Sequence, residues 1–442
     1  MNLRWNTLLP YAALILLPGA VAAAEGTTQV SQGQYLATAG DCVACHTAAG
    51  GKPFTGGLKM STPLGAIYST NITPDKETGI GNYSYDDFAK AVRQGVAKDG
   101  HHLYPAMPYT AFAKINDADM HALYDFFMHQ VTAVRQPNRD SDIPWPLSMR
   151  WPLAVWNWVF HDDQVYTPDD KQSAQWNRGA YLVQGLEHCG TCHTPRGIAF
   201  QEKALDQSDS AYLTGGTLEG WHAPDLTANA KEGLGSWSEG DIAQFLKTGR
   251  TDRSAAFGSM TDVVEHSTQY LTDDDLKAMA VYLRSLKASD EKAAAPKADN
   301  ATVLALTQGD MRKPGAQEYM DNCAACHRID GAGYAKTFPA LAHNPALLSD
   351  DPSSLVSIVL RGGKMAVTKD AVTGLTMPDF AWRLNDQQVA DVVSFIRSSW
   401  GNQASAVSAD QVKALRKGLS TVERKEPNKA NEPNTDRPNS GQ

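Results

Sequence analysis

The chain has 442 residues, of which 42% are hydrophobic and 20% charged, and its net charge is −9 at pH 7. This length is enough for about three domains of ordinary size, and the composition is that of globular domains rather than of a disordered chain. The negative charge argues against nucleic acid as a partner and indicates little about any other.

The beginning of the chain has the pattern of a secretory signal peptide. Arg4 supplies a positive charge, residues 8–17 form an apolar core, and residues 22–24 are alanines suited to cleavage. An uncleaved membrane anchor is the alternative, but the apolar run is short for a bilayer span and is interrupted by Pro10 and Pro18. We therefore predict that residues 1–24 are a signal peptide and that the chain is exported.

All six cysteines lie in three copies of the motif C-x-x-C-H, and these copies are Cys42-Val43-Ala44-Cys45-His46, Cys189-Gly190-Thr191-Cys192-His193 and Cys323-Ala324-Ala325-Cys326-His327. This motif attaches a c-type haem: the two thiols bond to the haem vinyl groups, and the histidine binds iron from the same helical turn. A redox dithiol or a zinc half-site could explain one copy, but neither explains three copies that are each followed by histidine. The sequence predicts three covalently bound c-type haems.

One motif falls in each domain-sized part of the chain, which predicts a mainly α fold of three tandem cytochrome c domains joined by irregular linkers. Each domain opens with a glycine close to an aromatic residue and ends in an amphipathic helix, and these two helices should cross closely. The predicted domains are residues 25–136, 173–290 and 307–402, with linkers at 137–172 and 291–306 and a polar tail at 403–442. The predicted last helices are Asp117 to Gln130, Thr272 to Lys287 and Asn385 to Ser399, with Asn116, Thr272 and Asn385 as N-caps.

The first two domains also share a longer pattern. Residues 71–84 align without a gap onto residues 225–238, and Asp87 and Gly95 continue the register opposite Asp241 and Gly249. The third domain keeps only the end of this pattern, Leu360-Arg361-Gly362. Self-similarity at domain length indicates duplication.

The first linker is rich in proline and contains Trp145, Trp151, Trp156 and Trp158. These rings either pack between the first two domains or contact a partner subunit or the membrane interface, where tryptophan is favoured. Residues 288–301 have the composition of a flexible linker. Near the end, Val407 to Leu419 form a short amphipathic stretch before a polar segment that we expect to be disordered.

The ligand on the other side of each iron separates electron transfer from oxygen or peroxide chemistry. Methionine suits an electron carrier, and it should lie between the haem motif and the last helix of the domain. Met107, between prolines, fits in the first domain, Met260 is the only such methionine in the second, and Met377 fits in the third. The alternatives are Met60, which is too close to His46; Met120 and Met128, which suit a helix core; Met365, which competes with Met377; and His101 or His102, which could replace Met107.

Other residues carry weaker signals. His222, His266 and His343 are predicted to be surface or loop residues. Pro339 lies shortly after His327, where its carbonyl could accept the imidazole N–H and orient the ring. No Ser–His pair, carboxylate pair or nucleotide-binding signature stands out, so the chain is expected to carry electrons and to leave catalysis to a partner.

Together these motifs resemble the three-haem cytochrome c subunits of membrane-bound bacterial dehydrogenases, which act on gluconate, alcohols and polyols. The supporting stretches are GDCVACHT, STNITPDKETGIGNYS, YPAMPYT, HCGTCHTPRG, CAACHRIDGAGY, LRGGKMAV and TMPDF. The resemblance implies the ligand pairs His46/Met107, His193/Met260 and His327/Met377. It also implies a periplasmic, membrane-associated subunit that passes electrons to ubiquinone from a catalytic subunit, with a possible small third subunit.

By overall similarity the gluconate 2-dehydrogenase type, whose partner is a flavoprotein, is favoured over a quinoprotein alcohol or polyol dehydrogenase. Two further hypotheses are a multihaem peroxidase or reductase with one vacant site, and a free soluble electron carrier.

Overall fold

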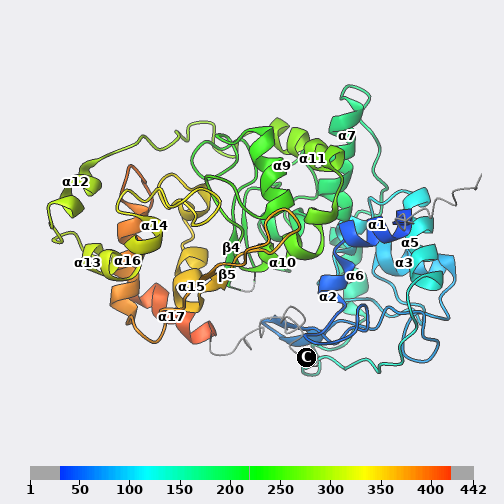
Figure 1. The fold of residues 1–442 in the computed structure, drawn as a ribbon. Helices are drawn as coiled ribbons and strands as arrows, with labels where there is room; N and C mark the ends of the chain where they lie inside the picture. The colour runs from blue at the N-terminus through cyan, green and yellow to red at the C-terminus, as the bar shows by residue number, and fades with distance from the viewer. Residues whose placement is uncertain (1–29, 219, 420–442) are drawn as a thin grey trace, which may run out of the picture.

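The structure is a computed structural model that describes residues 30–218 and 220–419. Its described part is mainly helical, with three short two-stranded antiparallel ribbons, which confirms the predicted fold class (Figure 1). The predicted signal peptide and residues 420–442 of the predicted tail lie outside the described residues.

The first haem motif lies near the start of the first helical unit. The elements of this unit are α1 (Gln32–Ala39), α2 (Cys42–Cys45), β1 (Lys59–Thr62), β2 (Gly65–Tyr68), α3 (Tyr85–Gln94), α4 (Tyr109–Phe112) and α5 (Asp117–His129). The linker that follows contains one helix, α6 (Pro152–Phe160).

The second unit repeats this order and adds two short turns, one after its first helix and one before its last. Its elements are α7 (Ala174–Tyr181), the π-helical turn η1 (Leu182–Leu186), α8 (Gly190–His193), β3 (Gly216–Leu218), β4 (Trp221–Ala223), α9 (Glu239–Thr248), α10 (Ser259–His266), the 3₁₀ turn η2 (Thr268–Tyr270) and α11 (Asp273–Ser285).

The third unit is preceded by a short helix that begins in the predicted second linker, α12 (Ala301–Thr307). Its elements are α13 (Ala316–Asn322), α14 (Ala324–His327), the 3₁₀ turn η3 (Pro345–Leu347), α15 (Ser353–Arg361), β5 (Gly363–Lys364), β6 (Thr376–Met377) and α16 (Asp386–Arg397). The predicted amphipathic stretch forms α17 (Ala409–Leu419), which packs on α15 and α16.

The first and last helices of each unit cross where the sequence predicts. A Cβ atom on Gly33, Gly179 or Gly315 would lie 2.0, 2.0 or 2.2 Å from a backbone oxygen of α5, α11 or α16, respectively. Only glycine therefore allows these crossings. The predicted N-caps of the last helices are confirmed, since Asn116, Thr272 and Asn385 each accept a hydrogen bond from the third helical N–H.

The repeat between the first two domains has a structural reason. Ser84 and Asp87 form a capping box at the start of α3, and Ser238 and Asp241 form the same box at α9. Each helix then ends at a glycine with positive φ, which is Gly95 in α3 and Gly249 in α9.

The first two domains form one unit around a shared hydrophobic core, whereas the third has a core of its own. Two tyrosines make reciprocal contacts between the first and the second domain. Tyr35 of the first domain donates to Asp275 Oδ2 at the start of α11 (2.6 Å), and Tyr181 of the second donates to Asp119 Oδ2 at the start of α5 (2.7 Å). This exchange gives the pair an approximate two-fold arrangement.

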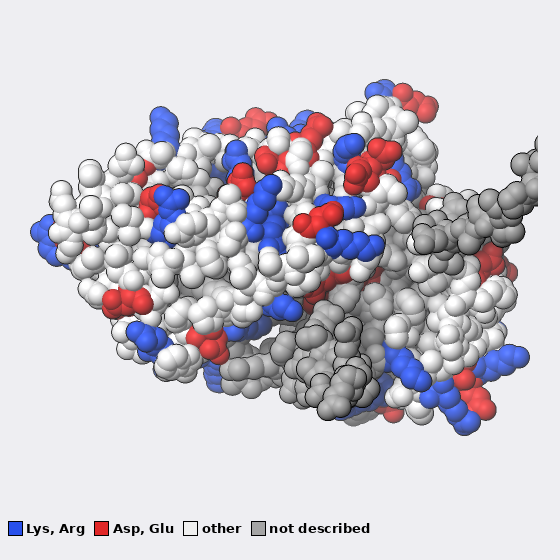
Figure 2. All heavy atoms as spheres, viewed as in Figure 1, with Lys and Arg blue, Asp and Glu red and all other residues white. Residues whose placement is uncertain are grey.

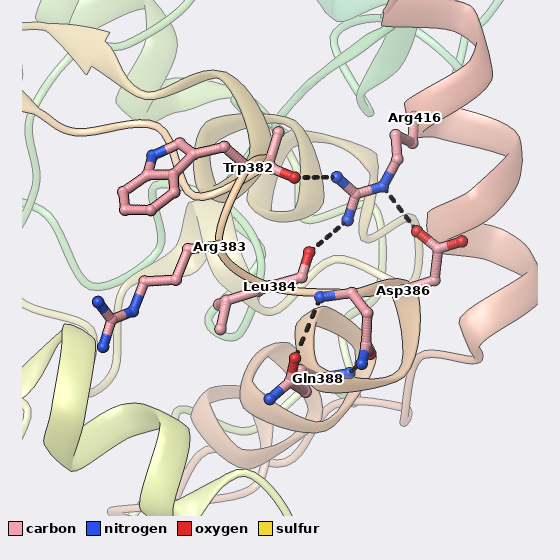
Figure 3. Close-up of a pocket in the computed structure, with 8 residues that line it drawn as sticks. Trp382, Arg383, Leu384, Asp386, Gln388 and Arg416 are labelled. Carbon is pink, nitrogen blue, oxygen red and sulfur yellow. Dashed lines mark hydrogen bonds and ion pairs between the residues drawn. The ribbon is translucent and has the colours of Figure 1, made fainter.

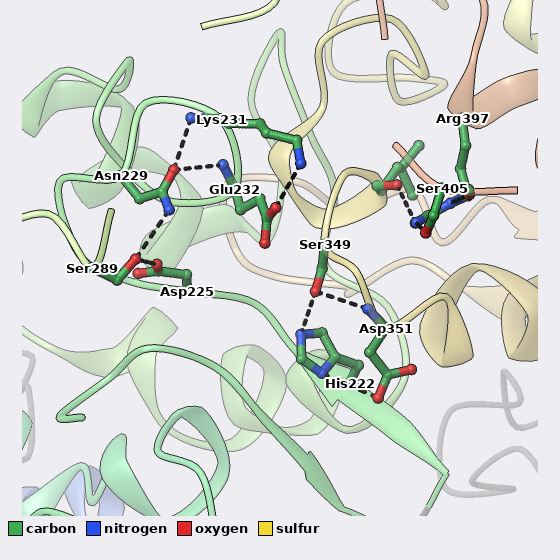
Figure 4. Close-up of polar contacts among 11 residues, drawn as sticks. His222, Asp225, Asn229, Lys231, Glu232, Ser289, Ser349, Asp351, Arg397 and Ser405 are labelled. Atoms are coloured by element: carbon green, nitrogen blue, oxygen red, sulfur yellow. Dashed lines mark hydrogen bonds and ion pairs between the residues drawn. The ribbon is translucent and has the colours of Figure 1, made fainter. Parts of the chain in front are cut away.

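The second and third domains meet through polar contacts, part of which Figure 4 shows. His222 on β4 hydrogen-bonds to Ser349 Oγ (2.8 Å) and lies 3.5 Å from Asp351 Oδ2. Its backbone N–H and carbonyl both bond to the Ser354 hydroxyl. The prediction that His222 is a surface or loop residue is therefore wrong, because packing against another domain covers it.

The tryptophans of the first linker divide into two groups. Trp156 packs on Tyr109 of the first domain and donates its indole N–H to Ala199 O of the second, as the packing hypothesis predicts. Trp145, Trp151 and Trp158 are exposed, by 80%, 66% and 84%. On the face seen in Figure 2, acidic and basic side chains are intermixed, and no patch of one sign dominates.

Candidate haem centres

Each motif histidine is held in one orientation by a backbone carbonyl, as a histidine that would hold a haem iron requires. The Nδ1 atoms of His46, His193 and His327 hydrogen-bond to the carbonyls of Thr70 (2.7 Å), Pro224 (2.7 Å) and Pro339 (2.9 Å). Burial lowers the pKa of all three imidazoles, and these carbonyl contacts oppose the shift. Each ring is therefore neutral at pH 7, with Nδ1 occupied and Nε2 left to bind iron.

The role predicted for the Pro339 carbonyl is confirmed by this hydrogen bond. The sequence did not lead us to predict the same role for the carbonyls of Thr70 and Pro224. A signal for them was present, because each directly precedes the start of the aligned repeat, at residues 71 and 225.

The cysteines do not have the properties of a redox dithiol or a zinc site. Burial raises the pKa of the Cys42 and Cys323 thiols to about 12, whereas a reactive dithiol needs a lowered pKa. Among the residues that the structure describes, no group of three or more His, Cys, Asp or Glu side chains is arranged to hold a metal ion. A zinc site would therefore lack its further ligands.

The residues present fit haem c. Each motif places two cysteines on one helical turn next to a histidine with a fixed ring. Two buried polar atoms, Trp237 Nε1 and Tyr104 Oη, have no partner among the described residues and could donate to haem carboxylates.

The three predicted methionine ligands lie in different local structures. Met107 is in the turn that leads into α4, and its carbonyl accepts from Tyr109 N (2.8 Å). Met260 lies in the first turn of α10 rather than on a loop, after Gly258, where a Cβ would lie 2.7 Å from the Trp221 ring. Met377 lies on β6, opposite Gly363.

The glycine retained by the third domain explains how Met377 is presented. Gly362 has a φ of +67°, and a Cβ there would lie 2.4 Å from Met377 O. Met377 packs against the core of the third domain, whereas Met107 and Met260 pack against the shared core of the first two. Each predicted ligand is thus in contact with the hydrophobic core to which its domain contributes.

The alternative candidates for the second iron ligand lie in different surroundings. Met120 is fully buried in α5, as predicted for a core residue. His101 Nδ1 is 2.5 Å from Asp99 Oδ1, and the His102 ring lies 3.3 Å from the Asn157 amide on α6. Met365 is on the same ribbon, where its N–H donates to Leu375 O (2.9 Å); it is buried, with 9% exposure, but unlike Met377 it does not pack in the hydrophobic cluster of the third domain.

A surface pocket of about 410 Å³ lies after the Met377 segment (Figure 3). Its prominent cation, Arg416, binds Asp386 (2.7 Å) and the carbonyls of Ala381 and Leu384 (2.7 and 2.8 Å). These bonds hold α17 on the third domain. The guanidinium is thus occupied by structural contacts.

The comparison with protein families decides the identity of the three helical units. The family model for cytochrome c matches three times, at residues 30–130, 177–287 and 313–400. The chain belongs to the cytochrome c family. This membership implies haem c as the prosthetic group, and the three matches lie within the three predicted domain ranges.

Three curated relatives are similar over most of the chain. The gluconate 2-dehydrogenase cytochrome c subunit of Pantoea cypripedii is 56% identical over 88% of this chain and 89% of that subunit. The cytochrome c subunit of the quinone alcohol dehydrogenase of Gluconobacter oxydans is 49% identical over 88% and 82%. The fructose dehydrogenase cytochrome subunit of Gluconobacter japonicus is 38% identical over 88% and 83%.

These relatives agree with the family resemblance read from the motifs. In the described part of this cytochrome c, no helix has both the length and the apolar character needed to cross a bilayer.

Proposed function

We propose that this cytochrome c is the electron-transfer subunit of a periplasmic, membrane-associated dehydrogenase complex. The observation that carries the proposal is the set of three histidines with Nδ1 bound to a backbone carbonyl, each in a domain that also presents a methionine. The pairs are His46/Met107, His193/Met260 and His327/Met377. When bound, each haem supplies a one-electron iron couple.

Histidine and methionine would together hold each iron and would leave no position for a substrate. The protein would then contribute rigid ligands and exclude water, so that the iron changes oxidation state with little rearrangement. A multihaem peroxidase or reductase, in contrast, needs one vacant site.

Ligand binding to the haem-loaded protein tests this proposal. We expect no binding of carbon monoxide or cyanide to the resting protein, and a weak far-red sulfur-to-iron band from all three haems. Met377→Ala should remove that band from one haem, with Met365→Ala as the matched control. Binding of carbon monoxide at one haem, or loss of the band in Met365→Ala instead, would contradict the ligand set.

The partner is proposed from the relatives. The 56% identity to a gluconate 2-dehydrogenase subunit favours a flavoprotein partner with a small third subunit, and the 49% identity to an alcohol dehydrogenase subunit keeps a quinoprotein as the alternative. Ubiquinone is the proposed acceptor. Substrate specificity resides in the catalytic partner, so co-purification from detergent-solubilised membranes should yield that partner; a cytochrome purified alone would favour a free carrier.

The proposed location is the periplasmic side of the inner membrane. The signal-peptide pattern of residues 1–24 supports export. Exposed Trp145, Trp151 and Trp158 support contact with the membrane surface, because tryptophan is favoured at the interface between lipid and water.

A further inference from the structure

The ribbon that carries Met377 leaves the third domain and lies on the second. In Figure 1 the orange strand segment that includes β5 runs from the yellow-to-red third domain across the green helices α9 and α10. At its base, Gly363 pairs with Met377 and Lys364 with Thr376. So short a ribbon is not stable without further support.

That support includes one buried cation of the second domain. Arg250, directly after α9, is only 4% exposed. Its Nη2 donates to Ala366 O (2.6 Å) and Thr373 O (2.8 Å), and its Nη1 donates to Thr373 Oγ1 (3.3 Å). Among the described residues, no carboxylate forms an ion pair with Arg250 and its Nε atom has no hydrogen-bond partner, so the guanidinium makes its hydrogen bonds to the ribbon through its two Nη atoms.

Two further side chains of the second domain bind the tip of the ribbon. Glu265 Oε1 accepts from Val367 N (2.7 Å), and Gln269 Oε1 accepts from Lys369 N (3.2 Å). Both lie at or just after the end of α10, the helix that carries Met260 in its first turn.

Apolar packing completes the contact. Ala366 is buried with Ala256 and Val264, and Met260 packs against this group. A Cβ on Gly249 would lie 2.8 Å from the Ala366 Cβ, so the two domains approach too closely there for any other residue. The segment bearing Met260 and the segment bearing Met377 are therefore parts of one packed region.

We propose that Arg250 is a positioning residue for Met377, through which the second domain holds the ligand-bearing ribbon of the third. Removal of the guanidinium would leave the Ala366 and Thr373 carbonyls buried without a partner and would free the ribbon to move. The ligand set of the third haem is thus complete only while the second domain is docked. This inference rests on the proposed assignment of Met377 as a ligand.

The test uses the full haem-loaded chain and measures the far-red band of the oxidised protein as the pH is raised until methionine is displaced. Arg250→Met should move the midpoint for one haem about one pH unit lower or more, because hydrogen bonds to a charged group are among the strongest in proteins. Arg250→Lys, which keeps the charge and some of the donors, should recover part of the shift. The reduction potential of the same haem should fall in a stepwise potentiometric titration.

Two comparison variants separate the possible causes. Ser354→Ala removes the hydrogen bonds to the His222 backbone and so loosens the same domain interface at a place away from the ribbon. In this variant the far-red band should be lost at the same pH midpoint as in the wild type. Met377→Ala identifies the haem concerned, and adding Arg250→Met to it should cause no further loss of band.

The outcomes distinguish this inference from the proposed function. If Met377→Ala leaves all three bands intact, the ligand assignment itself fails. If Met377→Ala removes one band but Arg250→Met does not change its midpoint, or Ser354→Ala shifts it equally, the positioning role fails. Should Arg250→Met not accumulate, Glu265→Ala and Gln269→Ala must each lower the midpoint by a smaller amount, and unchanged midpoints in both would overturn the proposal.

Discussion

A single methyl group at Gly179 should disrupt the crossing of α7 and α11 that supports the second haem motif. The added Cβ would lie 2.0 Å from Ala278 O and 2.5 Å from Ala278 C, and real Cβ atoms essentially never come within 3.0 Å. Because both neighbours are backbone atoms, neither can rotate away, and the helices must separate by about 1 Å.

The expected cost follows from these contacts. Overpacking a close-packed core costs about 1–3 kcal/mol, and an immovable backbone neighbour places Gly179→Ala at the upper end. Replacing glycine by alanine within a helix also stabilises the folded state by about 0.5–1 kcal/mol, because alanine loses less backbone entropy on folding. The net loss should be about 2 kcal/mol, which is roughly a thirtyfold change in an equilibrium constant.

Hydrogen exchange of the full haem-loaded protein measures this change locally. Amides of α7 and α11 should exchange about thirtyfold faster in Gly179→Ala. The matched control is Gly240→Ala in α9, where the new Cβ meets only Ser238 Oγ at 3.7 Å, so exchange should be unchanged or slower. If the amides of α7 and α11 exchange at the wild-type rate in Gly179→Ala, the reasoning is refuted. An increase in exchange rate in Gly240→Ala as large as that in Gly179→Ala would refute it as well.

Three further predictions concern two contacts between domains and the contact of the first linker with a membrane surface. Tyr181→Phe removes the hydrogen bond to Asp119, and a double-mutant cycle with Asp119→Ala in denaturant unfolding should give a coupling of about 1–2 kcal/mol. The hydrogen bond from His222 holds the pKa of Asp351 well below its ordinary value. That contact therefore contributes stability above about pH 4 and loses it as the pH falls through the depressed pKa. Small-angle scattering should show the third domain loosening at acid pH, and Asp351→Asn should loosen it already at neutral pH. Replacing Trp145 and Trp158 together by serine should reduce binding to lipid vesicles in flotation without changing haem spectra or thermal stability, because both rings are exposed.

Each of these predictions has a result that would contradict it. A coupling near zero would mean that Tyr181 only fills space between the domains. Scattering that does not change with pH, or that changes equally in Asp351→Asn, would remove that carboxylate from the interface. Unchanged flotation would exclude the two tryptophans as membrane contacts.

Residues close together in the chain could be interpreted without the structure. The haem motifs were recognisable because two cysteines and a histidine on one helical turn must meet the same haem. The N-caps Asn116, Thr272 and Asn385 bond to N–H groups only three residues away, so their pattern is also local. The glycines that open each domain predicted the helix crossings because only a missing Cβ allows such an approach.

The methionine ligands show the limit of this kind of inference. Their position between haem motif and last helix predicts candidates, but the type of local structure differs: a turn for Met107, a helix start for Met260 and a strand for Met377. Their assignment stays a prediction that the proposed spectroscopy tests. The third domain adds a competing neighbour, Met365, which sequence spacing alone cannot separate from Met377.

The sequence by itself determined the haem motifs, the number of domains and the helices that frame them, because the interactions responsible lie within one helix or one repeat. Only the tertiary structure decided which carbonyls orient His46 and His193, how Tyr35 and Tyr181 join two domains, and that Arg250 reaches the Met377 ribbon. These contacts join residues far apart in the chain. Their geometry depends on how whole domains pack, and no local pattern of residues encodes that packing.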